Sequence, residues 1–580
     1  MAGLALVTLA NLSALLQPFL LGRAIDAMAT GRSFRVLLEQ AGLILAAAIG
    51  AGAARFGMRQ LLNTISRRIE NDLRDDLFDH LLRLDAAFYA RMPTGELMSR
   101  MTNDTQAVRM AIGPGIMYLA NTLVLTLLAI AVMVRYNPTL TLISLGPLLL
   151  LPPVMVGFGR AIHARFEKIQ QHFGVMSTMV QENLSGVRIV RAYTQEDAQE
   201  REFAALNREY FDRNMALARI SAVFHPLLAV LTGLGVLAVL WFGGLAVIAG
   251  RNTPGEFVAF FFYLGMLVWP MIAIGWVINL FQRGAASMGR LEKIFEAEPL
   301  VRPAADPVPV RAARGQIEFR DVWFRYPGTE RDVLRGVSFR VDAGATAAIV
   351  GPTGSGKSTI AALLTRRYDP THGEILLDGV PLARIAPAQL RALITIVPQD
   401  AFVFSATLAD NIALGLPVDA VRDARIEEAA SIARLSDTIA AFPDGFETRL
   451  GERGVNLSGG QRQRATLARA LARDARVLIL DDALSAVDTQ TETEILRGLA
   501  DVIARRTAIV ISHRLSAVMN ADTVFVLDGG TIVERGRHED LIARGGLYAS
   551  LLRRQMLTED LEADTTAGSA PRLPGLPHVP

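Results

Sequence analysis

Six long apolar segments in the first half of the chain constrain its fold more than any other feature. They lie near residues 2–22, 36–56, 111–134, 139–159, 221–249 and 256–281. Each has about the 20 residues that an α-helix needs to cross a bilayer. Because lipid offers the backbone no hydrogen-bonding partner, such segments must satisfy their own backbone groups as helices. We therefore predict an all-α, six-helix transmembrane domain over residues 1–297.

The overall composition agrees with a membrane protein and excludes several other classes. The 580 residues are 51% apolar, with a mean hydropathy of +0.31. The net charge is only +2, so the chain lacks the basic signature of a nucleic-acid partner. With no cysteine, disulfides and thiolate chemistry are excluded. The first apolar segment begins at Met1 without a basic region before it, so we expect a retained helix rather than a cleaved signal peptide.

The segments between the apolar stretches differ in length and charge. Residues 57–110 and 160–220 are long, polar and rich in arginine, whereas the loops near 23–35, 135–138 and 250–255 are short and hold fewer cations. The positive-inside rule then places both long segments and both termini in the cytoplasm of a multi-pass cell-membrane protein. The stretch 298–316 is rich in proline and polar residues and reads as a linker.

Beyond the linker, short strands alternate with helices over residues 317–556, which indicates an α/β domain. Within it, an apolar strand and a helical run flank a glycine-rich loop that fits the P-loop pattern. In that pattern, Lys357 reaches the β- and γ-phosphates and the Ser358 hydroxyl binds Mg²⁺. The predicted nucleotide-binding residues of the loop are Gly351, Pro352, Thr353, Gly354, Ser355, Gly356, Lys357, Ser358 and Thr359. The sequence thus predicts a P-loop NTPase domain with ATP and Mg²⁺ as cofactors.

Two further motifs extend this site. An apolar strand ends in Asp481 and Asp482. A P-loop needs a carboxylate at the end of the adjacent strand to hold the metal, which suits Asp481, and Asp482 is placed to orient water. A basic helix opens with Ser458, Gly459, Gly460 and Gln461, a second anion-binding helix start. Since the chain already has one phosphate cradle, this second one is useful if it serves another chain's nucleotide across a dimer interface.

In this combination and order, the motifs resemble those of the ATP-binding cassette exporters, of the half-transporter type, over residues 1–556. The resemblance implies that Tyr326 stacks on adenine, that Gln399 senses Mg²⁺ and the membrane domain, and that His513 is the switch histidine. It also implies that Asp481 is the Walker B aspartate, that Ser458–Gln461 is the signature and that Ser485–Asp488 is the D-loop. The polar regions around residues 88–104 and 182–193 resemble the coupling loops of this family.

One position departs from the family pattern. The catalytic glutamate that usually follows the Walker B aspartate is replaced by Asp482. This pattern resembles the degenerate-site subunit of heterodimeric exporters, so the expected partner is a second, different half-transporter. Because His513 is retained, a homodimer that uses Asp482 as its catalytic carboxylate stays open.

The expected function is ATP-driven export of a small hydrophobic or amphipathic substrate: drug-like, lipid or peptide. Few charged residues occur within the apolar segments, which argues against an ion-driven carrier. Phe262, Trp269 and Trp276 recur every seven residues, a stripe that favours helix packing or lipid contact over substrate lining. Alternatives are a homodimeric lipid or drug flippase, an ATP-gated channel, an importing subunit and a soluble cassette ATPase. The acidic, then Pro/Gly-rich residues 557–580 are expected to form a disordered tail.

Overall fold

The computed structural model describes residues 2–311, 313–416, 422–512, 514 and 518–566. The chain divides into two compact units. The first comprises residues 1–82 and 93–297, and the second comprises residues 83–92 and 298–580. A short stretch that follows the second membrane helix in sequence, residues 83–92, is thus part of the second unit.

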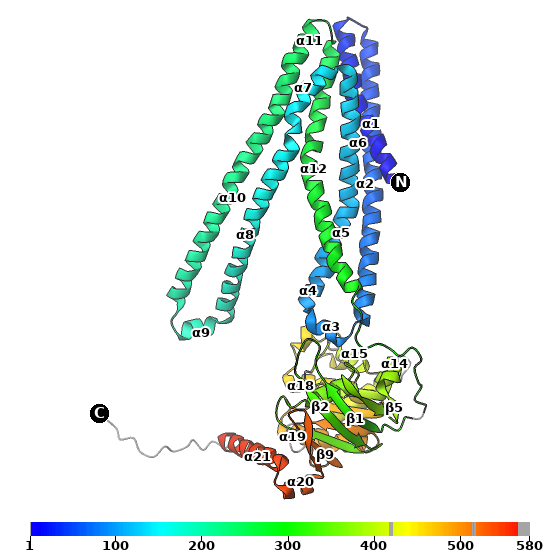
Figure 1. Cartoon of the computed structure of the whole chain (residues 1–580), viewed down its shortest axis with the longest axis vertical. Helices are drawn as coiled ribbons and strands as arrows, with labels where there is room; N and C mark the ends of the chain where they lie inside the picture. The colour runs from blue at the N-terminus through cyan, green and yellow to red at the C-terminus, as the bar shows by residue number, and fades with distance from the viewer. Residues whose placement is uncertain (1, 312, 417–421, 513, 515–517, 567–580) are drawn as a thin grey trace, which may run out of the picture. The chain divides into compact units, whose positions relative to one another are not determined.

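The first unit is entirely helical (Figure 1). Its helices are α1 (Ala2–Ala29), α2 (Phe34–Arg83, whose last residue falls in the second unit), α4 (Thr94–Ser99), α5 (Thr105–Met110), α6 (Ile116–Tyr136), α7 (Pro138–Leu149), α8 (Leu151–Ser185), α9 (Val187–Ala192), α10 (Glu196–Ala238), α11 (Gly244–Ile248) and α12 (Pro254–Phe295). Three π-helical turns, at Arg100–Asp104, Ala111–Gly115 and Val239–Gly243, join some of these into longer rods. Among the described residues, six continuous helices are long and apolar enough to cross a membrane, which confirms the predicted six-helix domain.

Polar contacts hold α8 to α10 and α2 to α5. Helices α8 and α10 run side by side and are joined by α9 (Figure 1). A hydrogen bond of 2.8 Å links His172 Nε2 to Leu206 O between them. On α2, the buried Glu70 carboxylate pairs with Arg74 at 2.9 Å and with Arg109 of α5 at 3.3 Å. The two arginine partners compensate the buried charge of Glu70.

The start of α12 packs tightly against the end of α1. Asp26 accepts hydrogen bonds from the Thr253 hydroxyl at 2.7 Å and from the Gly255 N–H at 2.8 Å. The backbones approach so closely that a Cβ on Gly255 would lie 1.9 Å from the carbonyl oxygen of Gly22. Further along, the buried Tyr263 hydroxyl donates to Leu15 O at 2.8 Å. Small residues at such a crossing allow the close helix packing that stabilises membrane bundles.

The second unit has two sheets. Its strands are β1 (Ile317–Phe324), β2 (Leu334–Val341), β3 (Thr346–Val350), β4 (His372–Leu377), β5 (Val380–Pro381), β6 (Ile394–Val397), β7 (Val477–Asp481), β8 (Thr507–Ile511), β9 (Thr523–Asp528) and β10 (Thr531–Gly536). An antiparallel sheet has the order β2-β1-β4-β5, and a mainly parallel sheet has the order β10-β9-β3-β8-β7-β6. The predicted α/β domain is confirmed.

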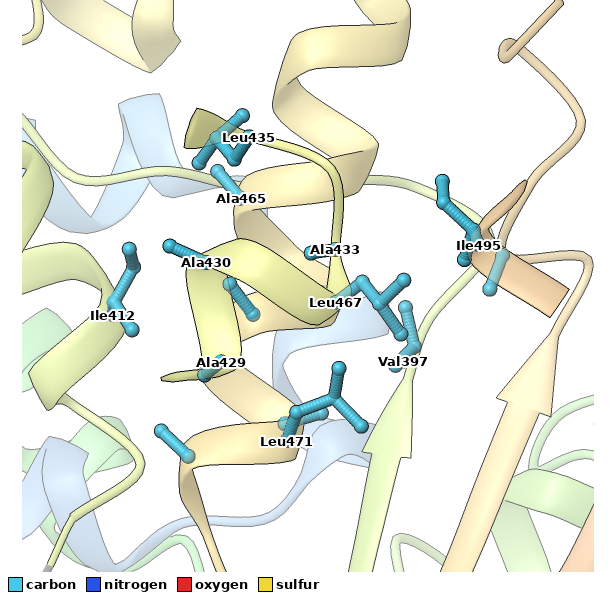
Figure 2. Packing of buried hydrophobic residues seen from close by; sticks show 14 of the residues in the cluster. Val397, Ile412, Ala429, Ala430, Ala433, Leu435, Ala465, Leu467, Leu471 and Ile495 are labelled. Atoms are coloured by element: carbon cyan, nitrogen blue, oxygen red, sulfur yellow. The ribbon is translucent and has the colours of Figure 1, made fainter. Parts of the chain in front are cut away.

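The helices of this unit cover the sheets and build a separate helical lobe. They are α3 (Ala86–Arg91), α13 (Lys357–Leu364), α14 (Pro387–Leu393), α15 (Leu408–Ala413), α16 (Arg422–Ile432), α17 (Ser436–Ala440), α18 (Gly459–Ala472), α19 (Thr489–Ile503), α20 (His538–Arg544) and α21 (Leu547–Thr566). Figure 2 shows how α18 is seated: Ala465, Leu467 and Leu471 pack among side chains of α15, α16, α19 and the end of β6. Helix α21 continues to Thr566, into the segment expected as a tail.

We predict that Gly255→Ala destabilises the first unit, because the new methyl group collides with the backbone of α1 and displaces Asp26. Overpacking of this kind typically costs about 1–3 kcal/mol. The thermal unfolding midpoint of the purified protein in detergent should fall. Gly265→Ala in the same helix is the matched control, since no neighbouring atom lies within 4 Å of a Cβ there. Equal midpoints for the two variants would contradict the close-contact argument.

Candidate nucleotide site

The P-loop connects β3 to α13 and depends on glycine for its path. Gly351, Gly354 and Gly356 have φ values of +153°, +79° and +105°. A Cβ on Gly351 would also lie 2.0 Å from Leu527 O, so a side chain there is excluded sterically as well. A loop of this kind exposes successive backbone N–H groups beside a helix N-terminus, which is the arrangement that binds phosphate.

Lys357, the first residue of α13, folds back over this loop. Its ammonium group donates to the carbonyl oxygens of Gly351 at 2.9 Å and Pro352 at 2.8 Å. Burial lowers the pKa of Lys357, while Asp482 and Asp481 act in the opposite direction. The ammonium is thus a partly desolvated cation at the mouth of the loop, where a phosphate group would be its best counter-charge.

Asp481 and Ser358 meet at the base of the loop. The Ser358 hydroxyl donates to Asp481 Oδ1 at 3.1 Å. Burial raises the pKa of Asp481, the Ser358 hydrogen bond opposes this, and the neighbouring Asp482 adds to it. Burial disfavours the charged form of a carboxylate, so a divalent cation bound beside it stabilises that form. Carboxylate and hydroxyl oxygens are also ligand types that suit Mg²⁺. These residues therefore fit the metal predicted for the site.

The sheet order corrects one detail of the sequence interpretation. Asp481 does not end the strand next to β3, because β8 lies between β3 and β7. The strands are parallel and in register at their carboxyl ends, with Ile511 of β8 paired to Ile349 on one side and to Asp481 on the other. Because Ser358 stands at the start of α13 above this edge, its hydroxyl still reaches across β8 to Asp481.

Asp482 leaves the sheet in an unusual conformation. Its φ is +49°, in the left-handed region that non-glycine residues seldom occupy. Its N–H donates to Ile511 O at 2.8 Å, which ties the backbone of Asp482 to β8. The sheet therefore fixes the position of the Asp482 Cα, whichever side chain the residue carries.

Tyr326 lies beside the P-loop helix, as part of an aromatic cluster. Its hydroxyl and that of Thr359 are 3.1 Å apart and hydrogen-bonded. Its ring meets Phe324 edge-on at 4.8 Å and Tyr368 edge-on at 5.3 Å, measured between centroids. Sequence reasoning missed Tyr368, although an aromatic residue soon after the P-loop helix is visible in the sequence.

The predicted signature residues form a capped helix start. The Ser458 hydroxyl accepts from Gln461 N–H at 3.2 Å, and Gln461 Oε1 accepts from Ser458 N–H at 2.8 Å. This reciprocal capping box fixes the first turn of α18. In the described part of the chain, no hydrogen bond joins these residues to the chain's own P-loop. The two phosphate-binding elements are thus separate features of one chain.

The segment Ser485–Asp488 is held from two sides by residues that sequence reasoning missed. Gln463 of α18 donates to the Ser485 hydroxyl at 2.9 Å and accepts from Ala486 N–H at 2.8 Å. Arg514 donates to Val487 O at 3.0 Å, to Ser485 O at 2.9 Å and to the buried Glu492. Only tertiary packing reveals these partners, because Arg514 and Gln463 are distant from the segment in sequence.

Two predicted site residues are not brought into these contacts. Gln399 follows β6 and is exposed, and the described residues offer its side chain no hydrogen bond. His513 lies outside the described residues. Their roles stay predictions.

Comparison with known proteins agrees with this geometry in both units. Residues 1–271 match the family model described as "ABC transporter transmembrane region", and residues 334–485 match "ABC transporter". The chain is 39% identical over 551 residues to the probable multidrug resistance ABC transporter ATP-binding/permease protein YheI of Bacillus subtilis, covering 94% of this chain and 93% of that protein. It is 36% identical to the multidrug resistance-like ATP-binding protein MdlA of Escherichia coli, over 97% of this chain and 95% of that protein.

Two further relatives extend the comparison. The ATP-dependent lipid A-core flippase of Syntrophus aciditrophicus is 35% identical, over 92% of this chain and 88% of that protein. A solved structure, described as a bacterial Atm1-family ABC exporter with ATP bound, superposes with a TM-score of 0.77 at 30% identity, covering 95% of this chain and 97% of that one. Both family models and relatives that cover almost the whole chain agree with the six apolar helices and the P-loop domain, and the chain belongs to the ABC transporter family, as a multi-pass membrane protein with an ATP-binding domain.

Proposed function

We propose that this chain is one half of a dimeric exporter that uses ATP and Mg²⁺ to move small hydrophobic or amphipathic molecules, drug-like or lipid, out of the cytoplasm. The observation that carries the proposal is the joining of six apolar helices to a P-loop site. In this site Lys357 lies over the loop and Ser358 is hydrogen-bonded to Asp481. Relatives named for multidrug resistance and for lipid A-core flipping support this class of substrate.

The membrane helices support an apolar substrate in a further way. Phe262, Trp269 and Trp276 on α12 are about half exposed in the single chain, and Trp276 meets Tyr118 of α6 edge-on at 5.0 Å. This surface is available to lipid, to a partner's helix or to a substrate. We place the nucleotide-binding domain and both termini in the cytoplasm, on the arginine-rich side of the membrane domain.

The proposed dimer follows from the separation of the two phosphate-binding elements. Ser458–Gln461 would close on the γ-phosphate held by a partner's P-loop, and the partner's signature would close on this one. Tyr326 would stack on adenine, and Gln399 and His513 would complete the site around the Mg²⁺ and the γ-phosphate. In this arrangement, binding of two nucleotides closes the dimer and hydrolysis reopens it.

The partner is proposed to be a different half-transporter, because Asp482 makes this chain's own site slow. An aspartate carboxylate stands one methylene further back than a glutamate carboxylate. The backbone of Asp482 cannot advance to compensate, since its N–H is bonded to Ile511 O. A misplacement of about 1 Å can cost roughly a hundredfold in rate. A homodimer that uses Asp482 is the alternative.

ATP-dependent uptake into inside-out vesicles tests the function directly, with ethidium and fluorescent phospholipids as probes. Lys357→Ala should abolish uptake and prevent photolabelling of this chain by azido-ATP, because the phosphates lose their buried counter-charge. Lys168→Ala is the matched control, since Lys168 is exposed on α8 in the other unit. Undiminished labelling of the Lys357 variant would overturn the proposed nucleotide site.

Tyr326→Ala should weaken ATP binding by the ~1–3 kcal/mol that is typical of base–aromatic stacking. Tyr326→Phe keeps the ring and loses only the hydrogen bond to Thr359, a loss of about 0.5–1.5 kcal/mol at most. Titration with a fluorescent ATP analogue measures both. If Phe and Ala weaken binding equally, the hydroxyl rather than the ring carries the effect.

Asp482→Glu should raise the ATPase rate of this chain's own site by up to about a hundredfold, because the longer side chain restores the missing reach. In a complex with a partner whose site is intact, Asp482→Asn should change turnover little. Both are measured as steady-state ATPase of the purified complex. Fast, transport-coupled ATPase from this chain alone, abolished by Asp482→Asn, would establish the homodimer instead.

A further inference from the structure

Asp85 makes an unusual set of hydrogen bonds within the second unit. It precedes α3, and its Oδ1 accepts from Phe88 N–H at 3.2 Å as the N-cap of that helix. Its Oδ2 accepts from Leu300 N–H at 2.5 Å and from Val301 N–H at 3.1 Å. One carboxylate therefore ends a helix and also holds the start of the linker, more than 200 residues later in the chain. Charge-assisted bonds of this kind are among the stronger ones in proteins.

Arg366 holds the next residue of the linker. It follows α13, the P-loop helix, and only 6% of it is exposed. Its Nη2 donates to Arg302 O at 2.8 Å, while its Nε donates to Asp369 at 2.9 Å. Leu300, Val301 and Arg302 are thus fixed between the start of α3 and the end of the P-loop helix.

Tyr368 connects this arrangement to the candidate adenine site. It stands two residues after Arg366, and its ring meets Tyr326 at 5.3 Å and Phe324 at 5.5 Å. Burial raises the pKa of the Tyr368 phenol; Tyr326 and Asp85 add to the rise, and Arg367 opposes it. The chain between Arg366 and Tyr368 is short and therefore couples the positions of the linker and the aromatic cluster.

We infer that Asp85 and Arg366 are positioning residues that clamp the linker at Leu300–Arg302, so that occupancy of the nucleotide site is also transmitted through the linker to α12, beside the route through α3 that the family's coupling loops imply. Both clamped segments are joined directly to membrane helices by the chain, because α3 follows α2 in sequence and the linker follows α12. The inference rests on the proposed function in one respect, that Tyr326 faces adenine. We call Asp85, Leu300–Arg302 and Arg366 the linker clamp.

The chain offers variants that separate this role from local stability. Asp85→Ser keeps an N-cap for α3, since serine caps helices well, but its hydroxyl is too short to hold the two linker N–H groups as well. Arg366→Lys keeps the charge and loses the planar fork. Asp378→Asn is the matched control: the Asp378 carboxylate accepts from Arg314, Gly315 and Gln316 N–H at the far end of the linker, outside the clamp.

The first measurement compares transport with hydrolysis in vesicles that contain the full-length protein and its partner. ATP affinity should be unchanged in the Asp85→Ser and Arg366→Lys variants, whereas ethidium transported per ATP hydrolysed should fall at least about fivefold, the lower end of typical coupling between sites. Asp378→Asn should keep the wild-type ratio. Equal ratios for wild type and both clamp variants would overturn the inference.

The second measurement does not depend on transport. Because the chain has no cysteine, Ala90→Cys in α3 and Ala305→Cys in the linker accept spin labels at these two sites only. Their distance distribution should be narrow with and without ATP, broad after Asp85→Ser, and narrow after Asp378→Asn. A broad wild-type distribution, or a narrow one after Asp85→Ser, would refute the clamp. A narrow wild-type distribution without transport of any probe would instead refute the proposed function and leave the clamp standing.

Discussion

The parallel pairing of β3, β8 and β7 is the interaction on which the nucleotide site depends. Each strand contributes its carboxyl end to one edge of the sheet, so the backbone hydrogen bonds of the sheet bring the P-loop, Asp481 and Asp482 together. The residues of these strands are almost entirely buried. Burial of both faces prevents slippage of the register, because a shift of one residue would move every side chain to the opposite face. The chemistry of the edge is thus fixed by an apolar core.

The same sheet explains why the site is charged and yet stable. Asp481 and Lys357 are both buried at the sheet edge, and burial raises the pKa of the first and lowers the pKa of the second. A hydrogen bond from Ser358 partly compensates the buried charge of Asp481, and two P-loop carbonyl groups partly compensate that of Lys357. A nucleotide with its metal ion supplies the opposite charges that these groups lack. A site that is held in this state before binding requires little rearrangement when ligand arrives.

Beyond the site, side-chain hydrogen bonds hold two irregular segments in place. Gln463 and Arg514 both hold Ser485–Asp488, and the linker clamp holds Leu300–Arg302 to α3 and to the end of the P-loop helix. In both cases side chains bond to backbone groups of an irregular segment, which gives a loop the rigidity that secondary structure gives elsewhere. Transmission through rigid segments of this kind needs only small displacements, since packed contacts do not deform continuously.

The sequence by itself determined the two kinds of domain, because their signals are local. Twenty-residue apolar runs specify membrane helices, and the P-loop pattern between an apolar strand and a helix specifies its own conformation through glycine. The sequence also showed that position 482, where the family pattern has a catalytic glutamate, is an aspartate. Tertiary structure decided which strand separates β3 from β7, that Asp482 is tied to Ile511, and that Tyr368 joins the aromatic cluster. It alone revealed that Asp85 and Arg366 meet the linker. Such contacts join residues far apart in sequence, and no local pattern encodes them, because they depend on how the intervening chain packs.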